Sequence, residues 1–356
     1  MLLFNNKFEY FDPLSKLVNR MVTYLCEQCD KIFDQKSHFD KHKVKKIPCK
    51  KPVEKNIILA LTKPLARPFL KWVGGKTQII EEVLASFPKE INNYYEPFLG
   101  GGSVLLGFLS HTDFKGKVYA SDINPNTIAL YKFIQNHCTM FIAELKKIVD
   151  VYNNIKGKDV NRKATTMEEA LTSQESYYYY MRSRFNGMAS KTTIEASAVL
   201  LFLNKTCFRG VYREGPLGFN VPFGHYDSPA IYDEEHLKDI SKLIQNVEFR
   251  CCSFEHALTN LTEKDFVYLD PPYAPINANS FVSYVSEGFS LDNHEKLFKI
   301  CKEMKNKFVM SNAEVELVKA SFPGPQYTTK IISCRRSINA KDPSSRVNEV
   351  LITKVS

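Results

Sequence analysis

The sequence contains no apolar run long enough to cross a bilayer. Its longest uninterrupted apolar stretch, residues 198–203, is far shorter than the roughly 20 residues that a membrane-spanning helix needs. The first four residues are too few for a signal peptide, so we expect a protein that is not secreted. Nine cysteines, an odd number, favour reduced thiols or metal ligands over disulfides. We therefore expect a reducing, intracellular compartment (a cytoplasm, a nucleoid or a viral factory) and no membrane partner.

The positive charge of the chain is confined to its N-terminal fifth. The formal net charge is +9, and residues 1–76 hold 16 Lys and Arg against 7 Asp and Glu, whereas residues 77–356 hold 32 of each. A basic segment attached to a neutral body is typical of an electrostatic anchor for nucleic acid, because phosphate neutralisation supplies most non-specific affinity. A solvated, solubilising tail is the alternative interpretation.

Within this basic segment, residues 24–50 have the spacing of a small zinc module. The spacing resembles the two-Cys, two-His zinc finger, with Phe33 and Phe39 as a small core and a cysteine in place of the second histidine. The expected zinc ligands are Cys26, Cys29, His42 and Cys49. His38 competes as a ligand, but the gap of 12 residues between Cys29 and His42 matches the finger and the shorter gap to His38 does not.

Zinc would supply the folding energy of this module, because so short a segment has little core of its own. If its helix forms, Gln35, His38 and Lys41 fall at the positions that face bases in DNA-reading fingers. One finger buries too little surface to specify a site, so auxiliary DNA anchoring is favoured over sequence selection, with protein contact as the alternative. Residues 1–23 are expected to form an N-terminal extension, and residues 51–66 a basic linker.

A four-residue motif in the body of the chain brings three chemical groups together. It follows the apolar run 266–269 and reads Asp270, Pro271, Pro272 and Tyr273. The Asp270 carboxylate accepts hydrogen bonds, the Pro271 carbonyl has no competing N–H beside it, and Tyr273 offers a flat stacking surface. That set suits an exocyclic amine on a planar heterocycle, such as the N6 amine of adenine. A buried strand followed by a proline turn is the alternative.

Two other segments have the features of a nucleotide site. Residues 94–106 predict a strand, a glycine turn and a helix, in which Gly100 and Gly102 let the backbone approach a ligand closely. Residues 117–122 predict a second strand that ends in Asp122, 20 residues after Gly102. A ribose-binding carboxylate belongs at that place in a Rossmann-type site.

The remaining elements predict a doubly wound sheet with a helical insertion. Residues 126–245 look largely helical, and residues 204–213 interleave aromatic and cationic side chains around a glycine, as in a hairpin for a DNA groove. An ordinary surface hairpin is the alternative. Strand 307–312 and an antiparallel pair, 327–335 with 348–354, complete a Rossmann-like arrangement.

Taken together, these motifs resemble those of the Dam-type DNA adenine-N6 methyltransferases. The match runs from Arg67 almost to the C-terminus, and it does not cover the zinc module. The motifs that carry it, in the family's order, are Lys71, Trp72, Gly74, Gly75 and Lys76; Phe98, Gly100, Gly102 and Ser103; Ser121, Asp122, Ile123 and Asn124; Arg182, Phe185 and Asn186; Asn220, Val221, Pro222, Phe223 and Gly224; Asp270, Pro271, Pro272 and Tyr273; and Ser311 and Asn312.

The resemblance implies a cofactor, S-adenosyl-L-methionine, and a substrate, double-stranded DNA. The implied cofactor-binding residues are Trp72, Lys76, Phe98, Gly100, Gly102, Asp122 and Asp270. Asp122 would hold the ribose hydroxyls, and Asp270 would lie between the cofactor and the target base. The implied DNA-binding residues are Lys71, Phe208, Val211 and Arg213, in a family best known for the sequence GATC. Many relatives have an aromatic residue followed by Asn where this sequence has Phe208 and Arg209.

The implied catalytic residues are Asp270, Pro271 and Tyr273. The target adenine must leave the base stack, and Tyr273 would stack on the flipped ring. Hydrogen bonds from both N6 protons to the Asp270 carboxylate and the Pro271 carbonyl would free the nitrogen lone pair. Direct attack on the methyl group then needs mainly positioning and charge placement, without a covalent enzyme intermediate or a catalytic metal.

We therefore expect a Rossmann-like α/β methyltransferase fold formed by residues 67–130 and 247–356. Residues 131–246 would form an inserted, mostly helical target-recognition domain, and the protein would be a monomer in solution. Methylation of RNA adenine or of a protein amide is the alternative activity. A zinc-finger DNA-binding protein with an inactive methylase body is the alternative from another class. A restriction pair, a repair system and viral genome marking all stay open as biological settings.

Overall fold

The computed structural model describes residues 24–26, 32–33, 35–44, 66–274, 289–335 and 346–354. The chain divides into two compact units, Met1–Ala60 and Leu61–Ser356. None of the helices in the described residues is both long enough and apolar enough to cross a membrane.

The first unit contains two short strands and a helix. The strands β1 (Tyr24–Leu25) and β2 (Ile32–Phe33) pair antiparallel, and α1 spans Lys36–Lys43. The Phe39 ring on α1 lies 5.7 Å from the Tyr24 ring and 5.9 Å from the Phe33 ring. The predicted contact of Phe33 with Phe39 is therefore confirmed. The order of two strands and a helix is the one that two-Cys, two-His fingers use.

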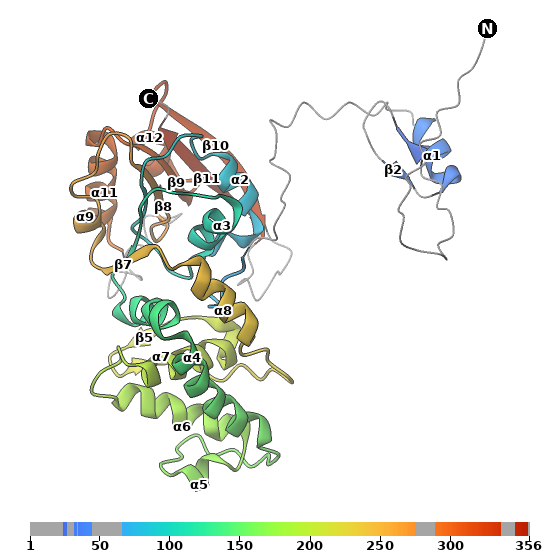
Figure 1. Ribbon diagram of the computed structural model, residues 1–356, viewed down its shortest axis with the longest axis vertical. Helices are drawn as coiled ribbons and strands as arrows, with labels where there is room; N and C mark the ends of the chain where they lie inside the picture. Colours follow the sequence, from blue (N-terminus) through green and yellow to red (C-terminus); the bar gives the residue numbers. More distant parts are fainter. Residues whose placement is uncertain are drawn as a thin grey trace. The chain divides into compact units, whose positions relative to one another are not determined.

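The second unit is built on a seven-stranded sheet with the strand order β10-β11-β9-β8-β3-β4-β7 (Figure 1). Its strands are β3 (Tyr94–Glu96), β4 (Val118–Asp122), β7 (Val247–Cys251), β8 (Phe266–Leu269), β9 (Lys307–Ala313), β10 (Tyr327–Arg335) and β11 (Arg346–Lys354). Neighbouring strands from β9 to β7 pair in parallel, and β11 pairs antiparallel with β9 and β10. The predicted strands and the terminal antiparallel pair are confirmed.

Helices cover both faces of the sheet. The elements around it are η1 (Lys76–Gln78), α2 (Ile80–Ala85), α3 (Ser103–His111), α9 (Phe254–Ala257), α11 (Leu291–Glu303) and α12 (Glu316–Ser321). Successive side chains of the central strand β8 point to opposite faces. Tyr268 packs in one buried cluster with α2 and α3, and Val267 and Leu269 pack in a second with α9, α11 and α12. The sheet is doubly wound, as predicted.

Figure 1 shows a helical region on one side of the sheet. It contains α4 (Pro125–Asn154), α5 (Met167–Ala170), α6 (Gln174–Gly187), α7 (Ile194–Thr206), α8 (Glu234–Leu243), the short turn η2 (Phe208–Gly210) and the hairpin β5 (Glu214–Gly215) and β6 (Gly218–Phe219). The predicted helical character of residues 126–245 is confirmed. Helix α4 begins beside the sheet, and non-helical backbone angles at His137 interrupt it.

The prediction of a hairpin at residues 204–213 is wrong. Helix α7 continues to Thr206, because its apolar side chains, buried from Ala196 to Leu203, pack against α4. The chain then turns through Arg209 and Gly210, whose φ angles are 57° and 65°. The true hairpin, β5 and β6, follows this turn.

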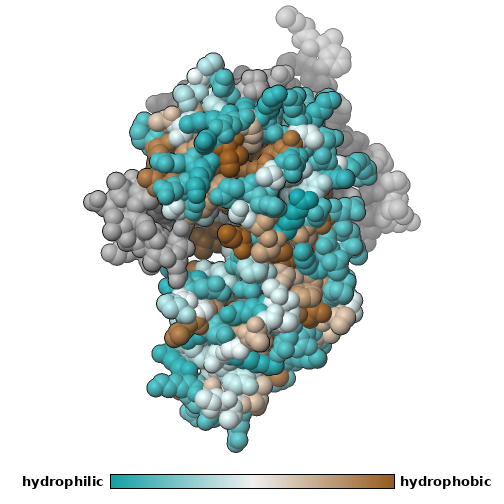
Figure 2. Space-filling model, turned by 90° about the vertical axis from the view of Figure 1, so that its left-hand side faces the viewer, coloured by the Kyte–Doolittle hydropathy of each residue, from teal (hydrophilic) through white to brown (hydrophobic). Residues whose placement is uncertain are grey.

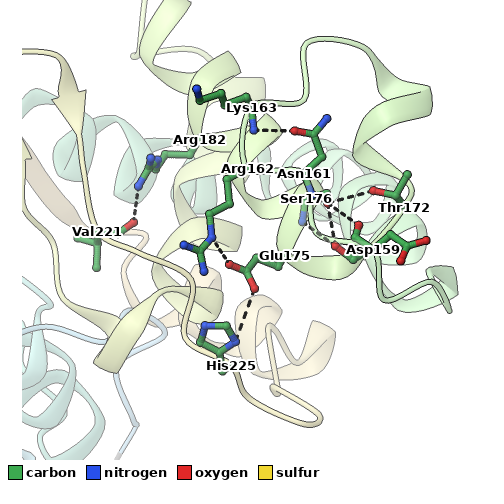
Figure 3. A network of polar contacts seen from close by, with 11 residues as sticks. Asp159, Asn161, Arg162, Lys163, Thr172, Glu175, Ser176, Arg182, Val221 and His225 are labelled. Carbon is green, nitrogen blue, oxygen red and sulfur yellow. Dashed lines mark hydrogen bonds and ion pairs between the residues drawn. The ribbon is translucent and has the colours of Figure 1, made fainter.

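Side chains of α6 hold the end of this hairpin and the residues that follow it (Figure 3). Arg182 Nη1 donates to the Val221 carbonyl at 3.0 Å, and Tyr178 Oη donates to the same oxygen at 2.7 Å. Asn186 makes two bonds to Phe219, accepting from its N–H at 2.8 Å and donating to its carbonyl at 2.9 Å. The motif that contains Arg182 and Asn186 therefore fixes the backbone of residues 219–221.

Glu175 of α6 extends this support to the next turn. Its carboxylate is buried and accepts from Arg162 Nε at 2.7 Å, and His225 Nδ1 lies 3.8 Å from its other oxygen (Figure 3). His225 has a left-handed φ of 51°, which costs a non-glycine residue free energy. The polar contacts of α6 therefore stabilise a strained turn at His225, close in sequence to residues 219–221.

Candidate active site

A cavity of about 1400 Å³ opens where the parallel strands β3, β4 and β8 end. In open α/β sheets, ligands bind outside the carboxyl ends of the strands. Among its lining residues are Trp72, Lys76, Phe98, Gly100, Asp122, Asp270, Pro271 and Tyr273. In Figure 2, apolar surface lies in the hollow between the sheet-containing part and the helical part of the second unit. The structure therefore brings six of the seven predicted cofactor residues and the predicted catalytic motif into one cavity, and Gly102 is not among the lining residues.

The Asp270 carboxylate at the end of β8 forms a buried ion pair. Lys76 Nζ lies 2.7 Å from Asp270 Oδ2, and the two side chains are 2% and 18% exposed. Lys76 also donates to the Gly74 carbonyl, so the Gly-Gly turn orients the ammonium group. Burial raises the pKa of Asp270, and the Lys76 charge opposes that rise. The ammonium group therefore favours the ionised carboxylate in a place where burial favours the neutral acid.

Asp122, the last residue of β4, connects that strand to the glycine turn at residues 100–102. Its carboxylate accepts from the N–H of Gly100 at 2.8 Å and from the N–H of Asn124 at 2.9 Å. Burial raises the pKa of Asp122, and these backbone N–H groups counteract the rise. Asp122 therefore fixes the glycine turn by a direct hydrogen bond, and its ribose-binding role stays a prediction.

The glycine turn requires residues without a side chain. Gly100 and Gly102 have φ angles of +47° and +65°, which L-residues with a Cβ rarely adopt. A Cβ at Gly100 would lie 2.7 Å from Trp72 Nε1, and a Cβ at Gly102 would overlap the Tyr131 hydroxyl. The turn therefore packs directly against Trp72, and backbone rather than side chains forms this wall of the cavity.

The cavity wall also contains a buried carboxylate, that of Glu96, which was not predicted. Glu96, the last residue of β3, is 2% exposed and accepts a 2.6 Å hydrogen bond from the Tyr94 hydroxyl. Burial raises the pKa of Glu96 to about 8, although the bond from Tyr94 opposes the rise. The only sequence signal is an acid directly before the glycine turn.

Tyr273 and the residue after it are held by groups from two strands, β9 and β11, and from η1. Its hydroxyl donates to Glu349 Oε2 of β11 at 2.8 Å, and Lys76 Nζ lies 5.0 Å from its ring centre. The next residue, Ala274, donates its N–H to Asn312 Oδ1 of β9 at 3.0 Å. Burial and two nearby carboxylates, those of Asp270 and Glu349, raise the pKa of Tyr273 well above its ordinary value, so its hydroxyl stays a donor.

Lys71 is the first of the four predicted DNA-binding residues. It lies beside the turn at residues 208–211, the predicted recognition turn. A Cβ on Gly210 would collide with the Lys71 side chain. The buried Asn204 amide bridges the two segments. It accepts from the Lys71 N–H at 2.8 Å, donates to the Lys71 carbonyl at 2.8 Å and donates to the Gly210 carbonyl at 3.2 Å.

The other three predicted DNA-binding residues follow on this turn. Phe208 is 47% exposed, Val211 is half-buried, and Arg213 is exposed with its Nε donating to Asn220 Oδ1 at 2.6 Å. Between them, Tyr212 stacks on Trp72 with ring centres 5.3 Å apart. This stack places the predicted recognition turn next to Trp72, one of the predicted cofactor residues.

The predicted zinc ligands fall partly outside the described residues. Cys26 is buried at the end of β1, and His42 lies on α1 with its ring 4.9 Å from that of Phe33. Cys29 and Cys49 lie outside the described residues. In the part of the chain that is described, no group of three or more His, Cys, Asp and Glu side chains could hold a metal. The zinc site therefore stays a prediction.

Glu96 should make the stability of the protein depend on pH. Its pKa is about 8 in the folded chain and lies near 4.5 when unperturbed, so only the unfolded state loses this proton between those values. The stabilising contribution of the protonated group is complete below pH 4.5 and is lost as the pH rises through 8. We expect the melting temperature of the wild type to fall relative to that of Glu96→Gln between pH 5 and pH 8.5. Parallel curves for the two proteins would contradict this.

Comparisons with known proteins identify the family of this chain. The family model of D12 class N6 adenine-specific DNA methyltransferases matches residues 72–337. Type II methyltransferase M.MjaIII of Methanocaldococcus jannaschii is 36% identical over 300 residues, which cover 80% of this chain and 98% of that protein. The DNA adenine methylase of Haemophilus influenzae is 30% identical over 287 residues, covering 79% and 90% of the two chains.

A third relative, Type II methyltransferase M1.LlaDCHI of Lactococcus lactis subsp. cremoris, is 29% identical over 296 residues, covering 81% of this chain and 95% of that protein. The motif order, the doubly wound sheet and these similarities agree, and they confirm the family that the sequence motifs resemble. The chain belongs to the D12 class of N6 adenine-specific DNA methyltransferases and is an S-adenosylmethionine-dependent DNA adenine methyltransferase.

Proposed function

We propose that this enzyme methylates the N6 amine of an adenine flipped out of duplex DNA, with Asp270, Pro271 and Tyr273 as its catalytic residues. The observation that carries the proposal is the arrangement at the end of β8. There the Asp270 carboxylate, paired with Lys76 at 2.7 Å, shares the cavity wall with Pro271 and the Tyr273 ring. An acceptor pair beside an aromatic ring suits an amino group on a planar base.

The residues of the cavity fit S-adenosyl-L-methionine. When bound, this cofactor supplies a methyl group on a positively charged sulfonium. The Asp270 carboxylate lies in the wall of this cavity, and a carboxylate there favours a cationic ligand. The bare backbone of the glycine turn admits close approach. We assign cofactor binding to Trp72, Lys76, Phe98, Gly100, Gly102, Asp122 and Asp270.

The catalytic residues act by positioning and charge. Flipping the adenine costs about a few kcal/mol, which stacking on Tyr273 offsets in part. The Asp270 carboxylate and the Pro271 carbonyl accept hydrogen bonds from the two N6 N–H groups, and these bonds draw the nitrogen lone pair out of conjugation with the ring. Lys76 keeps Asp270 ionised, so that it remains an acceptor.

DNA recognition is assigned to the surface formed by Lys71, Phe208, Val211 and Arg213. The Asn204 bridge supports this proposal, because it holds Lys71 and the turn at 208–210 in one fixed arrangement. We propose a target within GATC, on the resemblance of these positions to the Dam type. Left-handed backbone at Arg209 is a conformation that Asn adopts more readily, so Arg209 keeps a cation there at a conformational cost.

The organisation of the chain is part of the proposal. We assign residues 67–130 and 247–356 to the catalytic domain and residues 131–246 to the inserted recognition domain. The helices of that region support the assignment. The enzyme is proposed to act as a monomer inside the cell.

The first unit is proposed to be a zinc finger that binds one structural Zn²⁺ through Cys26, Cys29, His42 and Cys49. The two strands and one helix, with the aromatic contacts of Phe39, support it. Auxiliary anchoring to DNA is the proposed role, because the positive charge excess of the chain lies in residues 1–76.

Replacing Asp270 tests the catalytic assignment. We expect Asp270→Asn to lower kcat for transfer of a labelled methyl group to duplex DNA at least about a hundredfold, because the N6 amine loses its charged acceptor. The exposed Asp239→Asn serves as the matched control and should keep wild-type activity. Full activity of Asp270→Asn would overturn the mechanism, and stronger transfer to RNA or protein than to duplex DNA would favour the alternative substrates.

Metal analysis of the intact protein tests the zinc module. We expect one zinc per chain in the wild type and in Cys251→Ala, whose exposed cysteine lies in the catalytic body. Cys26→Ala should lose that zinc, because three ligands do not complete a structural site. An unchanged zinc content in Cys26→Ala would refute the site.

A further inference from the structure

Glu349 is a carboxylate with an unusual place in the sheet. It lies on β11, where it pairs with Ala313 of β9 and Ile332 of β10. β9 separates β11 from β8, the strand that leads to the catalytic motif (Figure 1). The small side chain of Ala313 lies in between, and Glu349 Oε2 reaches the Tyr273 hydroxyl at 2.8 Å.

The surroundings of Glu349 fit a fixed acceptor. Among the described residues, the positive group near Tyr273 is Lys76, which is paired with Asp270 at 2.7 Å. Glu349 is half-buried in the cavity wall. Its neighbours on the same face, Val347 and Leu351, are apolar, and such a position usually takes an apolar residue. A carboxylate at such a position, accepting a hydrogen bond from the Tyr273 hydroxyl, indicates a functional role in the cavity.

Three other groups contact Tyr273 or the residue after it, and one of them, the Asp270 carboxylate, also hydrogen-bonds with the Tyr273 side chain. The hydrogen bond from Ala274 to Asn312 fixes the backbone after Tyr273, and the Lys76 ammonium lies on the ring face at 5.0 Å. Neither contact sets the far end of the ring, where the hydroxyl is. A bond at that end restricts rotation about the side-chain torsions and so defines the plane of the ring.

We propose that Glu349 is a positioning residue that holds the Tyr273 hydroxyl and thereby sets the plane on which the target adenine stacks. The inference rests on the proposed stacking role of Tyr273. Glu349 acts through Tyr273 and touches neither the base nor the reacting methyl group.

The test is a double-mutant cycle on kcat, with unmethylated duplex DNA and S-adenosylmethionine both saturating. Tyr273→Phe keeps the ring and removes its hydroxyl, and Glu349→Ala removes the acceptor. We expect each to lower kcat about tenfold, because a misplaced stacking surface weakens alignment of the N6 amine. The double variant should also fall about tenfold, since both changes break one interaction.

Three further variants separate positioning from general structural damage. Glu349→Gln retains an oxygen acceptor and should recover most of the kcat that Glu349→Ala loses. Thr353→Ala, on the same strand but outside the cavity, should behave as wild type. The affinity for S-adenosylmethionine, measured by calorimetry, should be unchanged in Glu349→Ala and Tyr273→Phe, because neither group is assigned to the cofactor.

The outcomes distinguish this inference from the proposed function. A roughly hundredfold loss in the double variant, an unchanged kcat in Glu349→Ala, or failure of Glu349→Gln to restore activity would overturn the role of Glu349. A loss of cofactor affinity in Glu349→Ala would also overturn it. Tyr273→Ala tests the stacking role itself, and full activity of that variant would refute the proposed function.

Discussion

The buried ion pair between Lys76 and Asp270 is the interaction on which the site depends. A carboxylate placed at the end of β8 loses solvation, and burial alone would favour its neutral form. A neutral carboxylic acid carries an O–H group, which is a donor, whereas the N6 amine of the target needs an acceptor. The Lys76 ammonium at 2.7 Å favours the ionised form, and it donates a hydrogen bond to the carbonyl of Gly74. The Gly-Gly turn is thus linked through Lys76 to Asp270 of the proposed catalytic motif.

Contacts of Lys71 and Trp72 connect the cavity with the predicted recognition turn. Trp72 packs on the glycine turn on one side and stacks on Tyr212 on the other. One residue earlier, Lys71 is bonded through both of its backbone groups to Asn204, which also binds the recognition turn. Because these contacts link the turn at 208–211 to Trp72, we expect a movement of that turn to displace Trp72 in the cavity wall. The polar contacts of α6 fix the segment that follows the turn.

The sequence allowed the sheet, the helical insertion and much of the site to be predicted, because strand-end acids such as Asp122 and Asp270 are local signals. The hairpin at residues 204–213 was wrong because packing of α7 against α4 prolongs the helix, and local composition does not report that packing. Glu349 was missed because its contact with Tyr273 depends on the register across three strands. Glu96 was missed because its altered pKa arises from burial.

The most direct test of the central claim is the pH dependence of kcat for the wild type and Lys76→Met, with DNA and S-adenosylmethionine saturating. Lys76 lowers the pKa of Asp270, so its removal raises that pKa and protonates the acceptor over a wider range of pH. The acidic limb of the kcat profile should therefore move to higher pH in Lys76→Met, while activity recovers at alkaline pH. An acidic limb at the same pH in both proteins would contradict the account.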